Sequence, residues 1–394
     1  MGDVRVVHIS DSHLGKVQFN SAEREEDFYS SFSRAVELAI SEKPDLVIHT
    51  GDLFDSYRPN PRAFVRAFDS LIKLAERGIP LAIIEGNHEL GPDIARRQIT
   101  SPLVSLESLF SRVGYGGMFL RLNAKVERIG DVVVAGLPYK SSGREIPRVI
   151  EYLERKSKEI CKCPSILMIH QGVRGLIKTF YPELEFSDVA KTSFDYVAMG
   201  HYHNKVVIGT GRRYFAYPGS TEVVEPREAF SSDGKKYILS VEVSNDCLEV
   251  KELPLETRPF ITFSETIKST RDLYVLIERL KEFLSSSKEK PVVYGKVRIA
   301  GPMRPGFAAG EIRRSLSESS IHVSVREKLE EEEEELFEEP PHLGIEESIY
   351  QLIGSARVEE DVKELAMRVF EIWYKEGKRG KDFVDEVMRL VEEP

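Results

Sequence analysis

The sequence predicts an α/β protein in which buried parallel strands alternate with amphipathic helices. Short apolar runs such as residues 46–48 are bounded by turn residues, and segments with helical apolar spacing, such as 23–42, lie between them. Polar and histidine side chains follow directly after several of these runs. Open α/β sheets place their chemistry beyond the carboxyl ends of their strands, so this pattern predicts an active site at one sheet edge.

Residues 45–55 form the segment around which the rest is organised. Gly51 allows a sharp turn after the apolar run, so that Asp52 lies just beyond the end of the predicted strand. A carboxylate there can give one oxygen to each of two cations about 3.5–4 Å apart. That spacing clamps both the attacking and the leaving oxygen of a phosphoryl displacement.

Length and composition indicate a protein of two or three domains that neither spans a membrane nor is secreted. The chain has 394 residues, 41% of them apolar and 30% charged, without a long apolar run or leader. We therefore expect a cytoplasmic protein. The net charge of −10 is concentrated in an acidic block from Glu327 to Glu339, which leaves room for a basic groove elsewhere. Three cysteines are too few for a zinc knuckle, so any metal must be held by oxygen and nitrogen.

Residues 4–254 carry the predicted strand–helix alternation. The predicted strands are 4–9, 46–48, 80–85, 131–135, 165–169 and 194–199, followed by mostly strands up to about 254, and the predicted helices are 23–42, 62–77 and 99–112. Five of the nine histidines in the chain directly follow such strands. Unrelated core histidines would have no reason to share one sheet edge with two aspartates and an asparagine. The joint set predicts a metal site made by Asp11, His13, Asp52, Asn87, His88, His170, His201 and His203.

Beyond a linker at 254–259 the pattern changes. The predicted elements are an extended stretch at 260–263, a helix at 270–285, a strand at 292–299, a helix near 309–318 and a strand at 321–325. Residues 343–394 have apolar positions at helical spacing in two stripes, separated by Gly377 and Gly380. These stripes fit either docking on a partner or a helical hairpin that packs on itself.

The motifs Asp11-x-His13, Gly51-Asp52, Gly86-Asn87-His88-Glu89, His170 and Gly200-His201-x-His203 resemble those of the calcineurin-like metallophosphoesterases. Within that superfamily, Asp11-Ser-His-Leu-Gly, Gly51-Asp-Leu-Phe, His170-Gln-Gly-Val and Tyr217-Pro-Gly-Ser resemble the archaeal Mre11 nucleases and, less closely, bacterial SbcD. The resemblance implies a four-layer α/β sandwich, a small α/β capping domain and a C-terminal helical segment. The implied division is nuclease domain 1–254, capping domain 255–326, acidic linker 327–342 and ATPase-binding segment 343–394.

The resemblance also implies two manganese ions. One would be held by Asp11, His13, Asp52 and His203, and the other by Asp52, Asn87, His170 and His201. Oxygen and imidazole ligands suit manganese and also admit iron or zinc. His88 would act on the scissile phosphate, and we expect Asp55 to pair with it and keep it protonated. Many archaeal and eukaryotic members have His where this chain has Asp55, so the DNA-handling role of that position does not carry over.

The function implied is that of a manganese-dependent DNA exonuclease and single-strand endonuclease in double-strand-break repair. Its partners would be double- and single-stranded DNA and an ABC-type coiled-coil ATPase of the Rad/SMC family, bound through 343–394, at the nucleoid. A phosphodiesterase or phosphatase for another substrate is the alternative, although a small substrate needs neither the extra domain nor the tail. A DNA-bridging scaffold with a vestigial site is disfavoured, because every ligand position holds a competent residue.

Two surfaces are also predicted. The helices at 62–77 and 99–112 carry apolar stripes that would form a homodimer contact, unless both stripes simply cover the sheet. Local positive charge would hold DNA despite the acidic total. The candidates are Lys16, Arg58, Arg62, Lys140, Arg144 and Lys178, with Lys296, Arg298 and Arg304 on the small domain.

Overall fold

The computed structural model describes residues 4–93, 98–141, 145–177, 183–232, 234–243, 247–287 and 289–329, with 365–366 and 368–369. The chain divides into two units, residues 1–329 and 330–394, and the architecture below is that of the first. Among the described residues, no helix combines the length and apolar character needed to cross a membrane. Most of the predicted tail stripes and almost all of the acidic linker lie outside the described residues.

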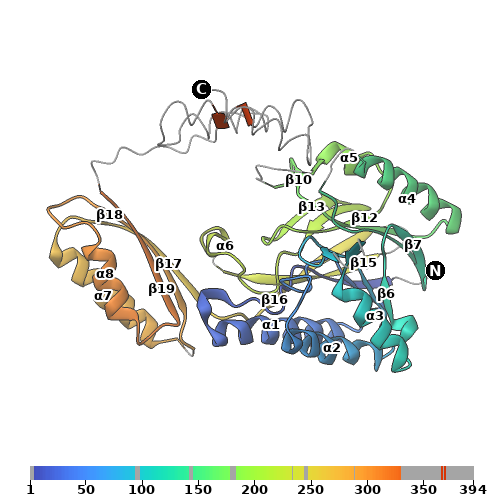
Figure 1. Cartoon of the computed structure of the whole chain (residues 1–394). Coiled ribbons are helices and arrows are strands. Elements are labelled where there is room, and N and C mark those ends of the chain that lie inside the picture. The colour runs from blue at the N-terminus through green and yellow to red at the C-terminus, as the bar shows by residue number, and fades with distance from the viewer. Residues whose placement is uncertain are drawn as a thin grey trace. The chain divides into compact units, whose positions relative to one another are not determined.

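Two six-stranded sheets form the body of the large domain (Figure 1). The strands of the first sheet are, in sheet order, β16 (Leu248–Leu255), β15 (Lys236–Val243), β1 (Val4–Ile9), β2 (Leu46–His49), β3 (Leu81–Ile83) and β6 (Phe119–Arg121). Those of the second are β13 (Val206–Thr210), β14 (Arg213–Tyr217), β12 (Tyr196–Gly200), β9 (Ser165–His170), β8 (Val132–Leu137) and β7 (Lys125–Ile129). The strands β1, β2 and β3 run parallel, as do β8, β9 and β12.

Helices cover the outer faces of both sheets, which gives the four layers predicted. The first sheet is covered by α1 (Ala22–Ser41), α2 (Pro61–Ala75) and α3 (Pro102–Arg112), and the second by α4 (Ile146–Ile160) and α5 (Phe186–Ala190). Between the sheets lies a buried apolar layer in which β1 and β2 side chains face those of β8, β9 and β12. The α/β sandwich is therefore confirmed.

Local sequence explains where the helices begin and end. Ser21 caps α1 by accepting a hydrogen bond from the Arg24 N–H, and the helix ends shortly before Pro44. Asn60 caps α2 in the same way, with Pro61 at its first position. Gly78 then takes a left-handed φ of 71° as the chain leaves that helix.

Two predicted boundaries and one missed helix are the main differences from the structure. The helix predicted at 99–112 begins at Pro102, because Ser101 caps it and residues Gln98–Thr100 form the short strand β5 instead. The helix α4 was not predicted. The final strand, β19 (His322–Leu329), continues beyond the predicted end at 325, so the acidic residue Glu327 belongs to a strand and accepts hydrogen bonds from the Gly306 and Ala309 N–H groups.

The small domain is a three-stranded parallel sheet with helices on one face. Its strands β17 (Phe260–Ile267), β18 (Val292–Ile299) and β19 pair in that order, and α7 (Thr270–Ser285) and α8 (Phe307–Leu316) complete its core. The helix α6 (Pro226–Ser232) of the large domain contacts β17.

The apolar stripes of α2 and α3 are largely used inside the domain. Leu71, Leu103, Leu106 and Phe110 are buried in the layer that covers the first sheet. This supports the alternative that the stripes cover the sheet. Val65 and Val104 remain exposed, at 55% and 47%.

Candidate metal centre

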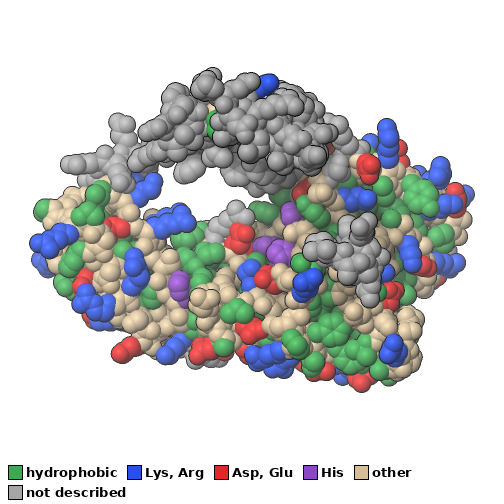
Figure 2. Space-filling view, in the orientation of Figure 1, with side chains coloured by type: hydrophobic (Ala, Val, Ile, Leu, Met, Phe, Trp, Pro, Cys, Tyr) green, Lys and Arg blue, Asp and Glu red, His purple; other side chains and the backbone are tan. Residues whose placement is uncertain are grey.

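The predicted ligands converge where the parallel strands of both sheets end. Asp11 and His13 follow β1, Asp52 follows β2, and Asn87 follows β3. His170 is the last residue of β9, and His201 and His203 follow β12. Figure 2 shows histidine side chains gathered near the middle of the visible face. All seven predicted ligands therefore meet at one place, although they come from two sheets.

The backbone at this place is strained. Asp11, His13, Asp52 and His201 have positive φ angles of 49°, 46°, 53° and 87°, a region that residues other than glycine rarely occupy. Each such residue costs roughly 1–3 kcal/mol, and such outliers concentrate at functional sites.

Two glycines allow the strand ends to come this close. A Cβ atom on Gly51 would lie 2.5 Å from His170 Nδ1 and 2.7 Å from the Gly86 nitrogen. A Cβ atom on Gly200 would lie 2.3 Å from the Thr50 carbonyl oxygen. A larger residue at Gly51 would press the loop after β2 away from His170 and Gly86, and one at Gly200 would press β12 away from Thr50, so either would move the ligands apart.

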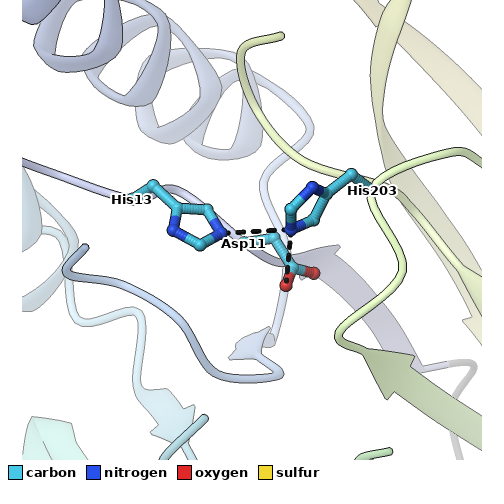
Figure 3. Close-up of side chains that lie close together, drawn as sticks. All are labelled: Asp11, His13 and His203. Atoms are coloured by element: carbon cyan, nitrogen blue, oxygen red, sulfur yellow. Dashed lines mark hydrogen bonds and ion pairs between the residues drawn. The ribbon is translucent and has the colours of Figure 1, made fainter. Parts of the chain in front are cut away.

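Asp11, His13 and His203 form the first group of donor atoms (Figure 3). The Nε2 atoms of His13 and His203 face each other at 3.2 Å, and His203 Nε2 lies 3.9 Å from Asp11 Oδ1. Asp52 Oδ2 completes the group at 3.8 Å from His13 Nε2. Asp11 is held in place by Ser10 Oγ, which donates to it, and by the His201 N–H, 3.0 Å from Asp11 Oδ1.

The second group is formed by Asp52, Asn87, His170 and His201. Asp52 Oδ2 lies 3.2 Å from His170 Nε2. Asn87 Oδ1 lies 3.2 Å from His170 Nε2 and 2.9 Å from His201 Nδ1. The other oxygen of Asp52, Oδ1, accepts the backbone N–H of His88 at 2.9 Å. Asp52 thus touches both groups, as expected of a residue shared by two ions.

The charge state of the centre follows from its burial and its carboxylates. Burial alone would lower the pKa of His170, but the Asp52 and Asp11 carboxylates outweigh it and raise this pKa to about 10. Burial likewise opposes ionisation of Asp52, yet His170 and His13 hold its pKa far below the usual value. Cations are therefore favoured beside Asp52.

Hydrogen-bond acceptors behind the histidines determine which ring nitrogen is free. His13 Nδ1 donates to Asp55 Oδ1 at 3.0 Å, His203 Nδ1 to Glu228 Oε1 at 2.9 Å, and His170 Nδ1 to the Thr50 carbonyl at 2.7 Å. A neutral imidazole that donates through Nδ1 has its lone pair on Nε2. The Nε2 lone pairs of His13 and His203 then face each other across 3.2 Å. This arrangement is repulsive unless a proton or a metal ion lies between the two nitrogens, and a metal that replaces the proton would be bound by both, so the donor set fits a metal.

Asp55 contacts other residues besides His88. Its carboxylate accepts from His13 and from Lys16 Nζ, at 3.0 and 3.1 Å, whereas His88 Nδ1 is 3.9 Å from it. His88 Nδ1 donates instead to the backbone carbonyl of Asp55, at 2.9 Å. The Asp55 carboxylate is thus within ion-pair distance of His88, as expected, but its hydrogen bonds go to the ligand His13 and to Lys16.

Several supporting residues were missed by sequence reasoning. Glu228 lies behind His203, and Glu183 Oε1 lies 4.0 Å from His201 Nε2. Glu89, which is buried, accepts the N–H groups of Asp52, Phe54 and Gly86 and so ties the loops after β2 and β3 together. Only Glu89 had a signal in the sequence, as the last residue of the motif at 86–89.

The predicted DNA-contacting residues differ in their exposure and in their ion pairs. Lys16 pairs with Asp55 beside the centre. Arg62 pairs with Glu26 and Glu25, which reduces its availability for phosphate. Arg58 is exposed in the loop before α2, and Lys140 is half-buried after β8. Arg144 and Lys178 lie outside the described residues.

The helix-free face of the small sheet carries a basic cluster that the sequence shows only in part. Lys296 on β18 pairs in register with Arg326 on β19, and Arg298 with Lys328. Lys296, Arg326 and Lys328 are exposed, and Lys296 Nζ also lies 4.7 Å from the centre of the Phe230 ring on α6. Like charges directly opposite each other on one sheet face destabilise the sheet. An anion bound across these pairs would relieve the repulsion.

The calcineurin-like phosphoesterase family matches residues 4–205 of this chain. This range contains β1, β2, β3, β8, β9 and β12 and all seven converging residues. The fold and the site together define a metallophosphoesterase, a class whose members use a dinuclear metal site.

More specific relatives cover most of the chain. The DNA double-strand break repair protein Mre11 of Methanococcus maripaludis is 32% identical over 301 residues, 74% of this chain and 77% of that protein. Mre11 of Methanocaldococcus jannaschii is 32% identical over 298 residues, 74% and 76% of the two chains. That of Sulfurisphaera tokodaii is 30% identical over 300 residues, 75% and 73% of the two. The chain belongs to the archaeal Mre11 family of calcineurin-like phosphoesterases.

Proposed function

We propose that this protein is a manganese-dependent DNA exonuclease and single-strand endonuclease that acts in double-strand-break repair. The observation that carries the proposal is the convergence of seven oxygen and imidazole donors around the shared Asp52, in a chain similar to archaeal Mre11 proteins. One ion would be held by Asp11, His13, Asp52 and His203, and the other by Asp52, Asn87, His170 and His201. When bound, two such cations neutralise a phosphodiester and lower the pKa of a water between them.

His88 is the residue proposed to act on the substrate itself. Its side chain is 35% exposed, whereas that of His13 is 1% exposed, so His88 can meet a phosphate from solvent. Nδ1 is engaged with the Asp55 carbonyl, and the ring packs edge-on against His13 with centroids 4.7 Å apart. Nε2 is therefore the atom that would contact the phosphate or protonate the leaving 3′ oxygen.

DNA would be held by the basic cluster on β18 and β19 together with Lys16, Arg58 and Lys140. The cluster lies on the face of the small sheet that its own helices leave open, and Lys296 contacts the large domain there through Phe230. A small phosphorylated substrate would not need this surface. That consideration favours DNA over the alternative of a general phosphodiesterase or phosphatase.

Two protein partners belong to the proposal. Residues 343–394 would bind an ABC-type coiled-coil ATPase of the Rad/SMC family, and we expect the complex at the nucleoid. A second copy of the chain would bind through the exposed side chains of α2 and α3, including Val65 and Val104. A protein ending at residue 340 should keep metal-dependent cleavage and lose co-purification with the ATPase. Undiminished binding by that protein would contradict the tail assignment.

A direct comparison of substrates tests the enzymatic proposal. The purified full-length chain with Mn²⁺ is given end-labelled duplexes with recessed and protruding ends, single-stranded circles and a chromogenic phosphodiester. Asp52→Asn, which removes a charge shared by both sites, is the inactive control. We expect rapid manganese-dependent shortening of the duplexes and cutting of the circles. Fast hydrolysis of the chromogenic diester with intact DNA would contradict the nuclease and favour the alternative.

A further inference from the structure

A buried chain of charged residues lies behind His203. Glu228 on α6 is 2% exposed, and its Oε1 accepts the Nδ1 hydrogen of His203 at 2.9 Å. Its other oxygen, Oε2, lies 2.5 Å from Nζ of Lys236, which begins β15 and is also 2% exposed. Lys236 therefore contacts Glu228, Glu228 contacts His203, and His203 belongs to the first group of donor atoms.

The hydrogen bonds around this chain hold both charges in fixed positions. The Glu228 carboxylate also accepts the backbone N–H groups of Val224 and Glu225, at 3.2 and 2.8 Å. Lys236 Nζ also donates to Ser220 Oγ at 2.8 Å and to the His203 carbonyl at 3.1 Å. Lys236 thus contacts His203 directly through its backbone and indirectly through Glu228. Burying two charges is unfavourable unless such geometry compensates it, which points to a role beyond filling space.

The two groups of donors differ in what lies behind their histidines. His13 and His203 each donate to a carboxylate that is itself paired with a lysine, Asp55 with Lys16 and Glu228 with Lys236. His170 donates to a neutral carbonyl, and the carboxylate nearest His201, Glu183 Oε1, lies 4.0 Å from its Nε2, beyond hydrogen-bond distance. A carboxylate acceptor makes the opposite ring nitrogen a stronger ligand and fixes the orientation of the ring. The Nε2 atoms of His13 and His203 are thus the better donors.

We propose that Glu228 and Lys236 are positioning residues for the ion held by Asp11, His13, Asp52 and His203, and that they make this the tighter of the two metal sites. The inference rests on the ligand assignment in the proposed function. Glu228 fixes the ring of His203 with its Nε2 lone pair toward the ion. Lys236 fixes Glu228 and balances its charge inside the protein.

Manganese binding, measured without turnover, tests this inference. The metal-free full-length protein is titrated with Mn²⁺, and free Mn²⁺ is followed by electron paramagnetic resonance. The wild type should show two classes of site. In Glu228→Gln the tighter class should weaken by about 10–100-fold while the weaker class stays unchanged. Lys236→Met should weaken the same class.

A matched control separates positioning from stability. Glu222 is another fully buried glutamate, and its carboxylate accepts hydrogen bonds from the buried Arg24, from Ser31 Oγ and from the Val223 N–H. Glu222→Gln should lower the thermal unfolding temperature and leave both manganese classes in place. Glu228→Asp, which keeps the charge but draws the carboxylate back from His203, supplies a milder variant if Glu228→Gln does not fold. It should give an intermediate loss from the same class.

A double-mutant cycle then shows whether Glu228 acts through His203. If it does, Glu228→Gln should cause no further loss of manganese affinity in a His203→Ala background. This inference would be overturned if Glu228→Gln left manganese binding unchanged or weakened both classes of site equally. It would also be overturned by a full additional loss in the His203→Ala background, or by the same loss of affinity in Glu222→Gln. A wild-type protein that binds no manganese would instead overturn the proposed function.

Discussion

His88 and the seven converging residues differ in what they contact. His88 follows Asn87 in the chain, yet its Nδ1 is bonded to a main-chain carbonyl and its side chain reaches solvent. The structure also places a His88 ring nitrogen within reach of His13 and Asp52. Removal of the His88 ring would therefore lower metal content if His88 is a ligand, and only the cleavage rate if it is a catalytic residue.

We predict that His88→Ser binds two manganese ions normally and cleaves DNA about 10²–10⁴-fold more slowly. The reason is that general acid catalysis typically contributes this much. The measurements are metal content after gel filtration and single-turnover cleavage. Metal content that falls in step with activity would make His88 a ligand instead.

The raised pKa of His170 gives a prediction for the metal-free protein. Its ordinary pKa is 6.5, and although burial opposes the charge, Asp52 and Asp11 raise the pKa to about 10 in the folded state. The resulting stabilisation is complete below pH 6.5 and is lost as the pH rises from there toward about 10. Because a ligand must lose this proton, manganese binding near pH 8 should release about one proton and tighten with pH.

Calorimetry of manganese binding in buffers of different ionisation enthalpy measures that release. His170→Gln should bind manganese more weakly and release fewer protons. A wild-type protein that takes up protons at pH 8, or whose affinity falls as the pH rises toward 9, would contradict the charge state derived for His170.

At the level of single residues, the sequence predicted the metal ligands but not the residues that hydrogen-bond to them. Asp11, Asp52 and His170 are recognisable because each follows an apolar strand. Glu228 is not recognisable in this way, because its contact with His203 depends on how α6 folds back over the loop after β12. The left-handed backbone at the ligands was equally hidden, since it is imposed by the meeting of the two sheets.

Among the elements, α4 shows which helix signals were lacking. Its buried positions Ile146, Ile150, Leu153 and Ser157 have helical spacing. Glu145 at its start makes no capping hydrogen bond through its side chain, and α4 has no acidic residue in its first turn. The signals that remain are Pro147 near its start and the apolar periodicity.

The small sheet gives a second correction at this scale. Arg326 and Lys328 belong to β19, in register with Lys296 and Arg298. The sequence predicted that this strand ends at 325 and that an acidic linker begins at 327, which left Arg326 and Lys328 outside the predicted strand. Only the strand pairing shows that four basic residues share one face.

We predict that Lys296→Glu and Arg326→Glu each weaken DNA binding and reduce its salt dependence. Each lost phosphate contact should lower the slope of log affinity against log salt by about 0.9 for duplex DNA. Lys281→Glu is the control, because Lys281 lies on α7 and pairs with Glu278 there. The measurement is fluorescence anisotropy between about 50 and 200 mM salt. Equal losses in the control would mean that total charge, and not this face, governs binding.

For the whole molecule, two sheets bring their strand ends together to form one centre. The first sheet supplies Asp11, His13, Asp52 and Asn87, and the second supplies His170, His201 and His203. Neither sheet alone holds a complete set of ligands for both ions. Asp52, which touches both groups, is therefore the residue on which a two-metal centre depends.

Electron paramagnetic resonance of the protein loaded with two equivalents of Mn²⁺ tests this account most directly. Two ions that share Asp52 lie close enough to couple, so the wild type should give the many-line spectrum of a coupled manganese pair. Asp52→Asn should lose the coupled spectrum together with DNA cleavage. Two uncoupled single-ion spectra in the wild type, or a coupled pair that persists in Asp52→Asn, would contradict a two-metal centre built on Asp52.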